Sequence, residues 1–198
     1  LGAIKASKLV NGAEIIPVWA NDIDKSTCET YAMNIHNGDT SKIFCCPVQE
    51  LEFNKLPDFD GLSFGFPCND FSQVGQKKGT DGKYGPLYSY GVKAIKVKNP
   101  SWFIAENVSG LHSANDGKAF QNIIKELSEA GTYGYTLNIH LYKFEEYGIP
   151  QKRHRFIIVG VRNDLNVVFR VPKPTTLSPE SYKTAKYAIE NPPITQNL

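Results

Sequence analysis

Apolar residues along the chain follow two spacings, one typical of strands and one typical of helices. Residues Glu14–Asp22 read EIIPVWAND, which predicts a short buried strand that runs into Asp22. After it, apolar residues repeat at the i, i+3, i+4, i+7 spacing of a helix whose N-cap is Asp24. The residues on this helical face are Cys28, Tyr31, Ala32 and Ile35.

The same two spacings continue to residue 162. We expect further strands at 61–64, at 102–107, at 135–142, where apolar and polar residues alternate, and at 155–162, where the apolar run is nearly continuous. One helix is expected around Leu87 to Val97, weakened by Gly91. Another is expected to present Phe120, Ile123, Ile124 and Leu127 on one face, with Gly131 at C′. Strands that alternate with helices predict an α/β fold with a doubly wound, mostly parallel sheet.

After about residue 170 the pattern changes. Pro172, Pro174, Pro179, Pro192 and Pro193 crowd into a polar stretch, which predicts an extended tail or linker. We therefore expect a core at 1–170 and a proline-rich tail at 171–198. The chain begins at Leu1 and its only methionine is Met33, so we expect the native start to lie upstream.

Composition narrows the class of protein. The chain has 198 residues, 41% of them hydrophobic and 21% charged, with a formal net charge of +2. These values are ordinary for one globular domain, so any basic surface for nucleic acid has to be local. The longest apolar run without Gly or Pro, Phe156–Val159, is too short to cross a membrane, and the N-terminal pattern of a secretory signal is missing. The four cysteines form no CxxC pair, which favours a reducing, cytoplasmic compartment.

Reactive or charged side chains follow three of the predicted strands. These residues are Asp22, Cys68 and Glu106. Ligands bind beyond the carboxyl ends of the strands in doubly wound sheets. We therefore expect the three side chains to meet at one edge of the sheet.

Cys68 stands at the start of a long glycine-containing loop. Pro67 fixes its own backbone and restricts Phe66, so the thiol is held on a stiff support. A nearby Lys77, Lys78 or Arg155 that lowered its pKa would make it a nucleophile, whereas a buried, inert cysteine is the ordinary alternative. The loop at 69–86 does not fit a phosphate-binding P-loop, and it is either a mobile cover or a solvated surface loop.

Glu106 and two arginines are further candidates. Glu106 follows an apolar run, so burial is expected to raise its pKa and allow it to donate a hydrogen bond to a ring nitrogen; capping of the local turn is the alternative. Arg153 and Arg155 are two residues apart at the start of a strand, which favours contacts with a carbonyl, a phosphate or a carboxylate, although both could be surface residues. The four histidines show no metal-ligand spacing, so no metal is expected.

Three motifs together resemble those of the DNA cytosine-5 methyltransferases. They are GFPCNDFSQVG from Gly65, ENVSGL from Glu106 and YGIPQKRHR from Tyr147. The resemblance runs from about Trp19 to Pro174 and implies the Rossmann-like fold of S-adenosylmethionine-dependent methyltransferases. It implies that Cys68 adds to carbon 6 of a cytosine flipped out of duplex DNA, while Glu106 holds N3 and Arg155, supported by Arg153, contacts O2. Methyl transfer then leaves S-adenosylhomocysteine.

The resemblance also assigns residues to the cofactor and to DNA. Asp22 would bind the ribose, Ile23 would pack on the adenine, and Phe66, Pro67 and Leu87 would line the pocket. The glycine-containing loop would close over flipped DNA. Its DNA-facing residues would be Ser72, Gln73, Lys77, Lys78 and Lys83. Duplex DNA is the expected partner, and a bacterial or phage restriction-modification system is the expected setting.

The chain departs from the family pattern in several places. The family's Phe-x-Gly-x-Gly-Gly loop is expected just before Leu1 and its target-recognition region after Leu198, so a second subunit or further segment is expected to carry that region. Pro47, Asn69 and Tyr84 replace residues that are usual in the family. Two alternatives stay open, a catalytically silent scaffold and a transfer RNA cytosine-5 methyltransferase. The intact Cys68, Glu106 and Arg155 argue against the first, and FPCNDFS resembles the DNA-modifying branch more than the RNA branch.

Overall fold

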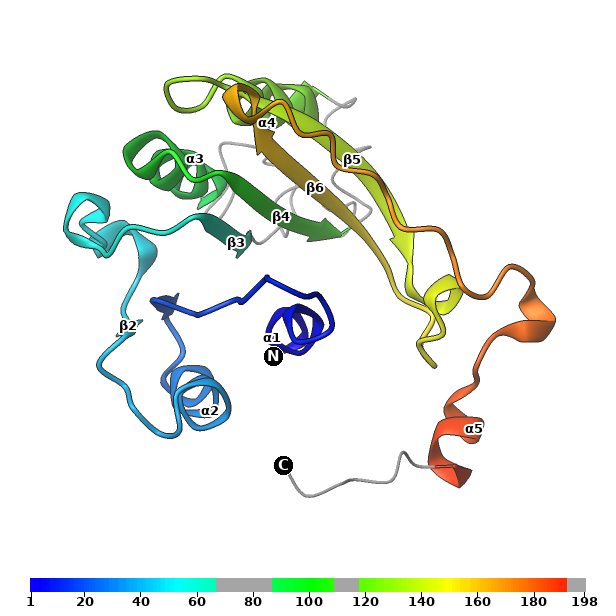
Figure 1. Ribbon diagram of the computed structural model, residues 1–198. Coiled ribbons are helices and arrows are strands. Elements are labelled where there is room, and N and C mark those ends of the chain that lie inside the picture. The colour runs from blue at the N-terminus through cyan, green and yellow to red at the C-terminus, as the bar shows by residue number, and fades with distance from the viewer. Residues whose placement is uncertain (67–86, 109–117, 192–198) are drawn as a thin grey trace. The chain divides into compact units, whose positions relative to one another are not determined.

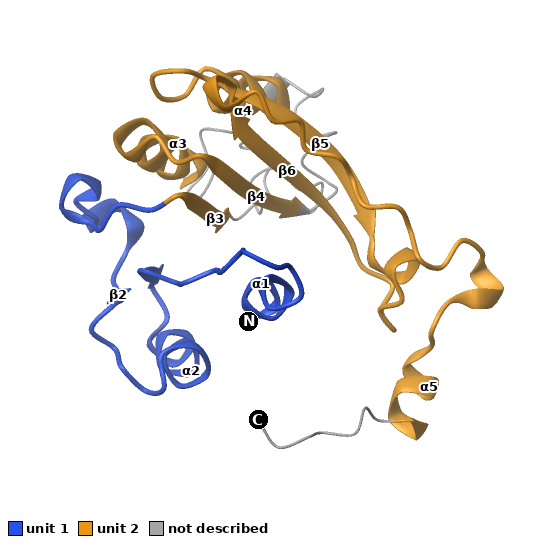
Figure 2. Cartoon of the chain, viewed as in Figure 1, with its two compact units in different colours: residues 1–59 blue, residues 60–198 orange. Residues whose placement is uncertain are grey.

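The chain forms two compact units. A computed structural model describes residues 1–66, 87–108 and 118–191. Unit 1 is Leu1–Phe59 and unit 2 is Asp60–Leu198 (Figure 2). Each unit contains its own sheet of paired strands.

Unit 1 holds a small parallel sheet with a helix between its two strands in sequence (Figure 1). Its elements are α1 (Gly2–Ser7), β1 (Ala20–Asp22), α2 (Lys25–Ile35), β2 (Ile43–Cys45) and the 3-10 turns η1 (Val48–Glu50) and η2 (Phe53–Lys55). Strands β1 and β2 pair in parallel, with Asp22 opposite Cys45. Asn21 secures the pair because its amide donates to the carbonyl oxygens of Phe44 and Cys46 at 2.7 and 2.8 Å.

The start of unit 1 confirms one prediction and corrects another. Asp24 caps α2 as predicted, since its Oδ1 accepts a hydrogen bond from the backbone N–H of Thr27 at 2.7 Å. The buried strand predicted over 14–22 is wrong for most of its length, because only Ala20–Asp22 are paired and Ile16 is 64% exposed. Pro17 has no N–H to donate to a strand ladder, which explains why pairing starts only after it.

Unit 2 is built on a four-stranded sheet. Its elements are β3 (Gly61–Gly65), α3 (Tyr88–Lys98), β4 (Trp102–Val108), α4 (Lys118–Ser128), β5 (Tyr135–Lys143), η6 (Phe144–Tyr147), β6 (His154–Arg162), η7 (Asn163–Leu165), η8 (Pro179–Ser181) and α5 (Ala185–Glu190). The strand order is β3-β4-β6-β5. Strand β6 runs antiparallel to both of its neighbours, whereas β3, β4 and β5 share one direction. The predicted α/β class with a mostly parallel sheet is confirmed.

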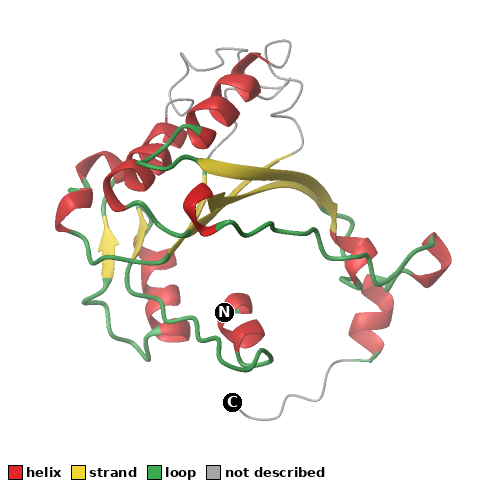
Figure 3. Ribbon diagram, turned by 45° about the horizontal axis from the view of Figure 1, so that its top comes forward, coloured by secondary structure: helices red, strands yellow, loops and turns green. Residues whose placement is uncertain are grey.

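Helices α3 and α4 cover one face of this sheet (Figure 3). On β4 the side chain of Phe103 lies on that face and is fully buried. The ring of Phe64 on β3 lies so close to α3 that a Cβ at Gly91 would come within 2.2 Å of it. On α4, Phe120 packs against Phe156 of β6 with ring centroids 6.0 Å apart. Gly91, which weakened the helix prediction, therefore permits the close approach of α3 to the sheet.

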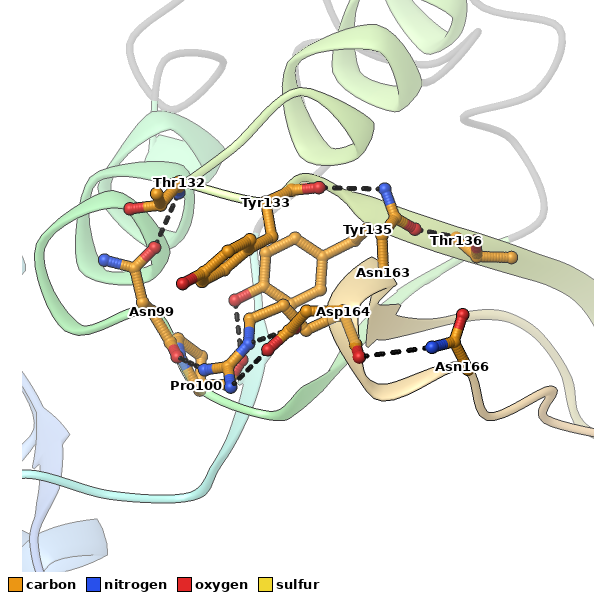
Figure 4. A network of polar contacts seen from close by, with 10 residues as sticks. Asn99, Pro100, Thr132, Tyr133, Tyr135, Thr136, Asn163, Asp164 and Asn166 are labelled. Atoms are coloured by element: carbon orange, nitrogen blue, oxygen red, sulfur yellow. Dashed lines mark hydrogen bonds and ion pairs between the residues drawn. The ribbon is translucent and has the colours of Figure 1, made fainter.

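A polar network joins the end of β6 to the loops that precede β4 and β5 (Figure 4). We call it the far-end network. Tyr135 donates its hydroxyl to the carbonyl of Pro100 at 2.6 Å. Arg162 donates to both carboxylate oxygens of Asp164, at 2.7 and 3.2 Å, and to the carbonyl of Asn99. The other members are Thr132, Tyr133, Thr136, Asn163 and Asn166.

Across the described ranges, none of the helices combines the length and the apolar character needed to cross a membrane.

Candidate active site

Glu106 lies near the carboxyl end of β4 and faces away from α3 and α4. Its strand neighbours Ala105 and Asn107 are buried, and side chains alternate along a strand, so the carboxylate points to the opposite face. Its register partner on β3 is Gly65, where a Cβ would lie 3.5 Å from Glu106 Oε2. The side chain of Glu106 is 42% exposed. The burial expected from the preceding apolar run is therefore wrong, because that burial alternates along β4.

Arg155 meets Glu106 from the neighbouring strand. Because β6 is antiparallel to β4, the start of β6 lies beside the carboxyl end of β4, with Arg155 opposite Val108. Nε of Arg155 lies 2.8 Å from Oε1 of Glu106. Nη1 of Arg155 donates to the carbonyl oxygen of His154 at 2.7 Å. Its Nε is buried and, among the described residues, no acceptor is aligned with its N–H, so the contact with Glu106 is electrostatic.

This pair places an acceptor and several donors side by side. The guanidinium is a planar fork of N–H donors, and an ionised carboxylate accepts hydrogen bonds at both oxygens. A partly exposed ion pair stabilises a fold by only about 0–1 kcal/mol, so stability alone does not explain the arrangement. Together the two groups can hold the edge of a polar, planar ligand.

Asn107 connects this end of β4 to the chain just after β3. Its side chain is buried, and Nδ2 donates to the carbonyl oxygen of Phe66 at 3.1 Å. Phe66 itself is buried, with its ring centroid 6.0 Å from that of Tyr88. Asn107 thus fixes the backbone from which residue 67 and the predicted nucleophile Cys68 continue.

Asp22 and Ile23 lie in unit 1, on a different sheet from Glu106. Among the described strands β1 pairs with β2 and β3 pairs with β4, so Asp22 and Glu106 lie on separately paired strands, and their meeting at one edge stays a prediction. Oδ1 of Asp22 accepts a hydrogen bond from the N–H of Asp24 at 2.9 Å, and no described residue binds its other oxygen. The side chain of Ile23 is 71% exposed. A free carboxylate oxygen beside an exposed apolar side chain fits a ribose and an adenine.

The remaining predicted residues are less informative. Arg153 is exposed, directly precedes β6 and forms no ion pair with a described residue; Leu87 is half-buried at the start of α3. No group of three or more His, Cys, Asp or Glu side chains within the described ranges could hold a metal ion. Seven predicted residues lie outside the described residues, namely Pro67, Cys68, Ser72, Gln73, Lys77, Lys78 and Lys83.

Glu145 and His154 were missed by the sequence analysis. Oε1 of Glu145 lies 2.7 Å from Nε2 of His154, the residue next to Arg155. Their sequence separation of nine residues has no regular period, because the turn η6 and a loop separate them. In the sequence, His154 stands between Arg153 and Arg155, and its spacing from the other histidines is not that of metal ligands.

Solved structures share the fold of this chain. The chain superposes on a putative DNA modification methyltransferase encoded within an Escherichia coli prophage with a TM-score of 0.66 and 22% identity, covering 89% of this chain and 49% of that one. An Entamoeba histolytica methyltransferase, EhMeth, matches with a TM-score of 0.62 and 14% identity, covering 88% and 53%. The fold is therefore that of the Rossmann-like methyltransferases.

The family is given by sequence. The chain belongs to the C-5 cytosine-specific DNA methylase family, whose family model matches residues 3–196. It is 55% identical over 179 residues to the type II methyltransferase M.BbvI of Brevibacillus brevis, covering 88% of this chain and 47% of that protein. It is 40% identical over 185 residues to M.NgoFVII of Neisseria gonorrhoeae, covering 89% and 47%. The chain thus spans about half the length of these relatives. The resemblance inferred from the three motifs is confirmed.

Proposed function

We propose that the protein containing this chain methylates carbon 5 of cytosine in duplex DNA, as part of a type II restriction-modification system. The observation that carries the proposal is the Glu106–Arg155 pair, with 2.8 Å between Oε1 and Nε, at the end of β4 in a chain of this family. The 55% identity to a type II methyltransferase supports it.

The described pair suits the polar edge of a cytosine ring. Arg155 donates to O2, which carries partial negative charge, and the carboxyl group of Glu106, in its protonated form, donates a hydrogen bond to N3. Addition of a nucleophile at carbon 6 shifts electron density toward N3, O2 and carbon 5, so both contacts strengthen as the reaction proceeds. Binding that strengthens in this way accelerates the chemical step.

Cys68 is the proposed nucleophile. Its thiolate forms a bond to carbon 6, which makes carbon 5 nucleophilic. S-Adenosylmethionine supplies an activated methyl group. After carbon 5 has gained the methyl group, a base removes the proton from carbon 5 and the bond between carbon 6 and sulfur breaks, which regenerates both the aromatic ring and the thiolate. Asn107 holds Phe66, two residues before Cys68, by its 3.1 Å hydrogen bond.

We propose cofactor contacts in each unit separately. In unit 1, Asp22 accepts hydrogen bonds from the ribose hydroxyls through the oxygen that Asp24 leaves free, and Ile23 packs on the adenine. In unit 2, the proposed cofactor contacts are Phe66, Pro67 and Leu87. Ser72, Gln73 and the lysines at 77, 78 and 83 contact DNA around the extruded base.

Covalent trapping tests the proposal. The full-length protein is incubated with tritiated S-adenosylmethionine and duplex DNA that contains 5-fluorocytosine, from which carbon 5 cannot lose a proton. We expect a labelled adduct resistant to denaturation, and no adduct with Cys68→Ala. Cys45→Ala is the matched control, because Cys45 is an exposed free thiol in unit 1, and it should form the adduct normally.

Three outcomes contradict the proposal in different ways. An adduct that persists in Cys68→Ala removes Cys68 from the mechanism. An adduct on transfer RNA and none on duplex DNA changes the substrate. Absence of any adduct, with stimulation of a separate methyltransferase, supports a silent scaffold.

A further inference from the structure

We propose that Glu145 and His154 are positioning residues for Arg155, and that they link its strand to the segment at residues 172–176. The inference rests on the proposed function, in which Arg155 contacts the base. Neither residue touches the substrate in this proposal; both act through the backbone at the start of β6.

The pair closes the connection between β5 and β6. In the strand register Lys143 lies opposite His154, and Tyr142 lies opposite Arg155, so these pairs are the last rungs of the ladder. Glu145 follows in η6, where it is 8% exposed, and its Oε1 lies 2.7 Å from Nε2 of His154. The side-chain contact thus fastens the first residue of β6 to η6 from a buried position.

His154 is in direct contact with the arginine that follows it. Its carbonyl oxygen accepts a hydrogen bond from Nη1 of Arg155 at 2.7 Å. Nε of the guanidinium also lies 2.8 Å from Oε1 of Glu106. A shift of the His154 backbone therefore moves one of the contacts that described residues make with Arg155. An error of about 1 Å in the position of a catalytic group can reduce the rate about a hundredfold.

The buried carboxylate depends on His154. Burial acts to raise the pKa of Glu145, but hydrogen bonds from His154 and from the N–H groups of Glu145 and Arg153 lower it below its ordinary value. Within the described part of the chain, Oε2 of Glu145 has no hydrogen-bond partner. A buried charge with one unsatisfied oxygen is costly, and removing its cationic or donor partner makes it costlier. Loss of His154 should therefore displace Glu145 and, with it, η6.

The turn η6 also holds the chain after β6. Thr176 donates its hydroxyl to the carbonyl of Glu145 at 2.6 Å, and the N–H groups of Thr175 and Thr176 donate to the carbonyl of Glu146, each at 2.9 Å. Tyr147 donates its hydroxyl to the carbonyl of Pro172 at 3.0 Å. One side of η6 thus binds the 172–176 segment while Glu145 binds the start of β6. A displacement of this segment would reach Arg155 through Glu145 and His154.

Steady-state kinetics of the full-length enzyme test the assignment. We expect Glu145→Leu, which removes the acceptor, and His154→Phe, which removes the donor, to lower kcat about tenfold to a hundredfold, as misplacement of a catalytic group does, while KM for S-adenosylmethionine stays within about twofold. The double variant should be no slower than the slower single variant, because the residues act as one unit. Thr176→Val, which keeps the shape but removes the hydroxyl, should lower kcat by a smaller factor. Asp164→Asn is the matched control, since it neutralises a carboxylate at the other end of β6, and it should keep the wild-type kcat.

A spectroscopic measurement separates this inference from the proposed function. The Nε–Hε resonance of Arg155, assigned by NMR with Arg155→Lys as reference, should move in Glu145→Leu and His154→Phe and stay in place in Asp164→Asn. Folded variants with wild-type kcat and an unmoved Arg155 resonance overturn the inference while the proposed function stands. If the wild type methylates no duplex DNA, the proposed function fails, and the Arg155 resonance still decides whether the pair positions that side chain. If a variant does not fold, Thr176→Val replaces it. A moved Arg155 resonance in Thr176→Val then supports the inference, and an unmoved one overturns it.

Discussion

Strand β6 carries an arginine at each end, and the two arginines are held differently. Arg162 donates to the carboxylate of Asp164 and to the carbonyl of Asn99, and its guanidinium lies 5.5 Å from the ring centre of Tyr133. Arg155 approaches Glu106 at 2.8 Å and binds only the carbonyl of His154 by an aligned hydrogen bond to a described residue.

The difference lies in what remains available to a ligand. In the far-end network the donors and acceptors are directed to fixed positions on the loops that precede β4 and β5, so the network closes on itself (Figure 4). At the other end a buried Nε without an aligned acceptor and a carboxylate that is 42% exposed retain bonding capacity. Buried polar groups in native structures are nearly always paired, and exceptions need an explanation. A polar ligand at the Glu106 end would supply one.

The largest expected effect follows from removing the pair at the Glu106 end. Glu106→Gln and Arg155→Ala should each lower kcat/KM for DNA methylation by about a hundredfold to a thousandfold, as loss of one transition-state contact does. The thermal midpoint of Glu106→Gln should change little, because a partly exposed ion pair contributes only about 0–1 kcal/mol. Filter-binding assays of tritiated methyl transfer measure kcat/KM, and calorimetry on the same samples measures the thermal midpoint. A large loss of stability with normal turnover would mean that the Glu106–Arg155 pair stabilises the fold, as the far-end network does, and does not serve catalysis.

The opposite result is expected at the far end. Arg162→Met keeps the length and apolar stem of the side chain and removes its contacts with Asp164, Asn99 and Tyr133. The thermal midpoint should fall by several degrees, because the carbonyl and carboxylate are left without their donor. The folded protein should turn over at the wild-type rate at a temperature well below its midpoint. Arg162→Lys, which keeps the charge, should recover part of the midpoint, whereas loss of kcat in either variant would contradict the assignment.

Local sequence patterns predicted much of the secondary structure and the candidate residues Glu106 and Arg155, but not all of the strands. Among the described residues, strands β3, β4, β5 and β6, helices α2, α3 and α4 and the end of β1 were predicted, because burial on one face leaves a period that can be read along the chain. Strand β2 was missed, since three residues are too few to show a period. Glu106 and Arg155 were named as candidates from the strand ends and the family motifs.

Their contact depends on pairing that no local pattern contains. Arg155 meets Glu106 only because β6 inserts antiparallel between β4 and β5. The Glu145–His154 contact depends on the fold of the connection at 144–153, which has no repeating pattern. Sequence reasoning therefore named Glu106 and Arg155 as candidates but did not name Glu145 and His154, which lie behind Arg155.

Two glycines on β3 allow a finer test of the same contrast. Gly61 lies opposite Trp102, and a Cβ there would come within 2.1 Å of the indole ring. Gly61→Ala should therefore cost about 1–3 kcal/mol of unfolding free energy through overpacking. Gly65 lies opposite Glu106, and its Cβ would make an ordinary contact of 3.5 Å with Oε2. Gly65→Ala should change stability by less than about 0.5 kcal/mol.

Activity should show the reverse order for the two glycines. The methyl group of Gly65→Ala would sit against Oε2 of Glu106 and hinder a ligand, so we expect methylation to fall about tenfold, the effect of roughly one lost neutral hydrogen bond. Gly61→Ala should leave methylation by the folded protein unchanged. Urea titration and methylation assays on both variants measure the two effects. Equal activity of Gly65→Ala and wild type would show that this side of Glu106 is not used.

The smallest expected effect is an alkaline loss of stability that originates in the far-end network. Burial raises the pKa of Tyr135 to about 12, with the charge of Asp164 adding to the shift and that of Arg162 opposing it. A tyrosine in an unfolded chain titrates near pH 10. Because the folded pKa is the higher one, the contribution of Tyr135 is complete below about pH 10 and is lost as the pH rises from there toward 12. Tyr88, whose pKa is also raised to about 12 by burial and by Glu126, should contribute a second share.

Tyr135→Phe measures how much Tyr135 contributes to the loss of stability at alkaline pH. At neutral pH it should lower the unfolding free energy by about 1 kcal/mol, since the hydrogen bond to the Pro100 carbonyl is lost. Between pH 9 and 11 its urea midpoint should fall less steeply than that of the wild type, because the contribution of Tyr135 is then absent while the other tyrosines of raised pKa still contribute. Tyr187→Phe, which alters a tyrosine that is 51% exposed on α5, should follow the wild-type curve. Parallel curves for Tyr135→Phe and wild type would mean that the hydroxyl of Tyr135 is not held at the far end, and the two ends of β6 would then differ less than their contacts indicate.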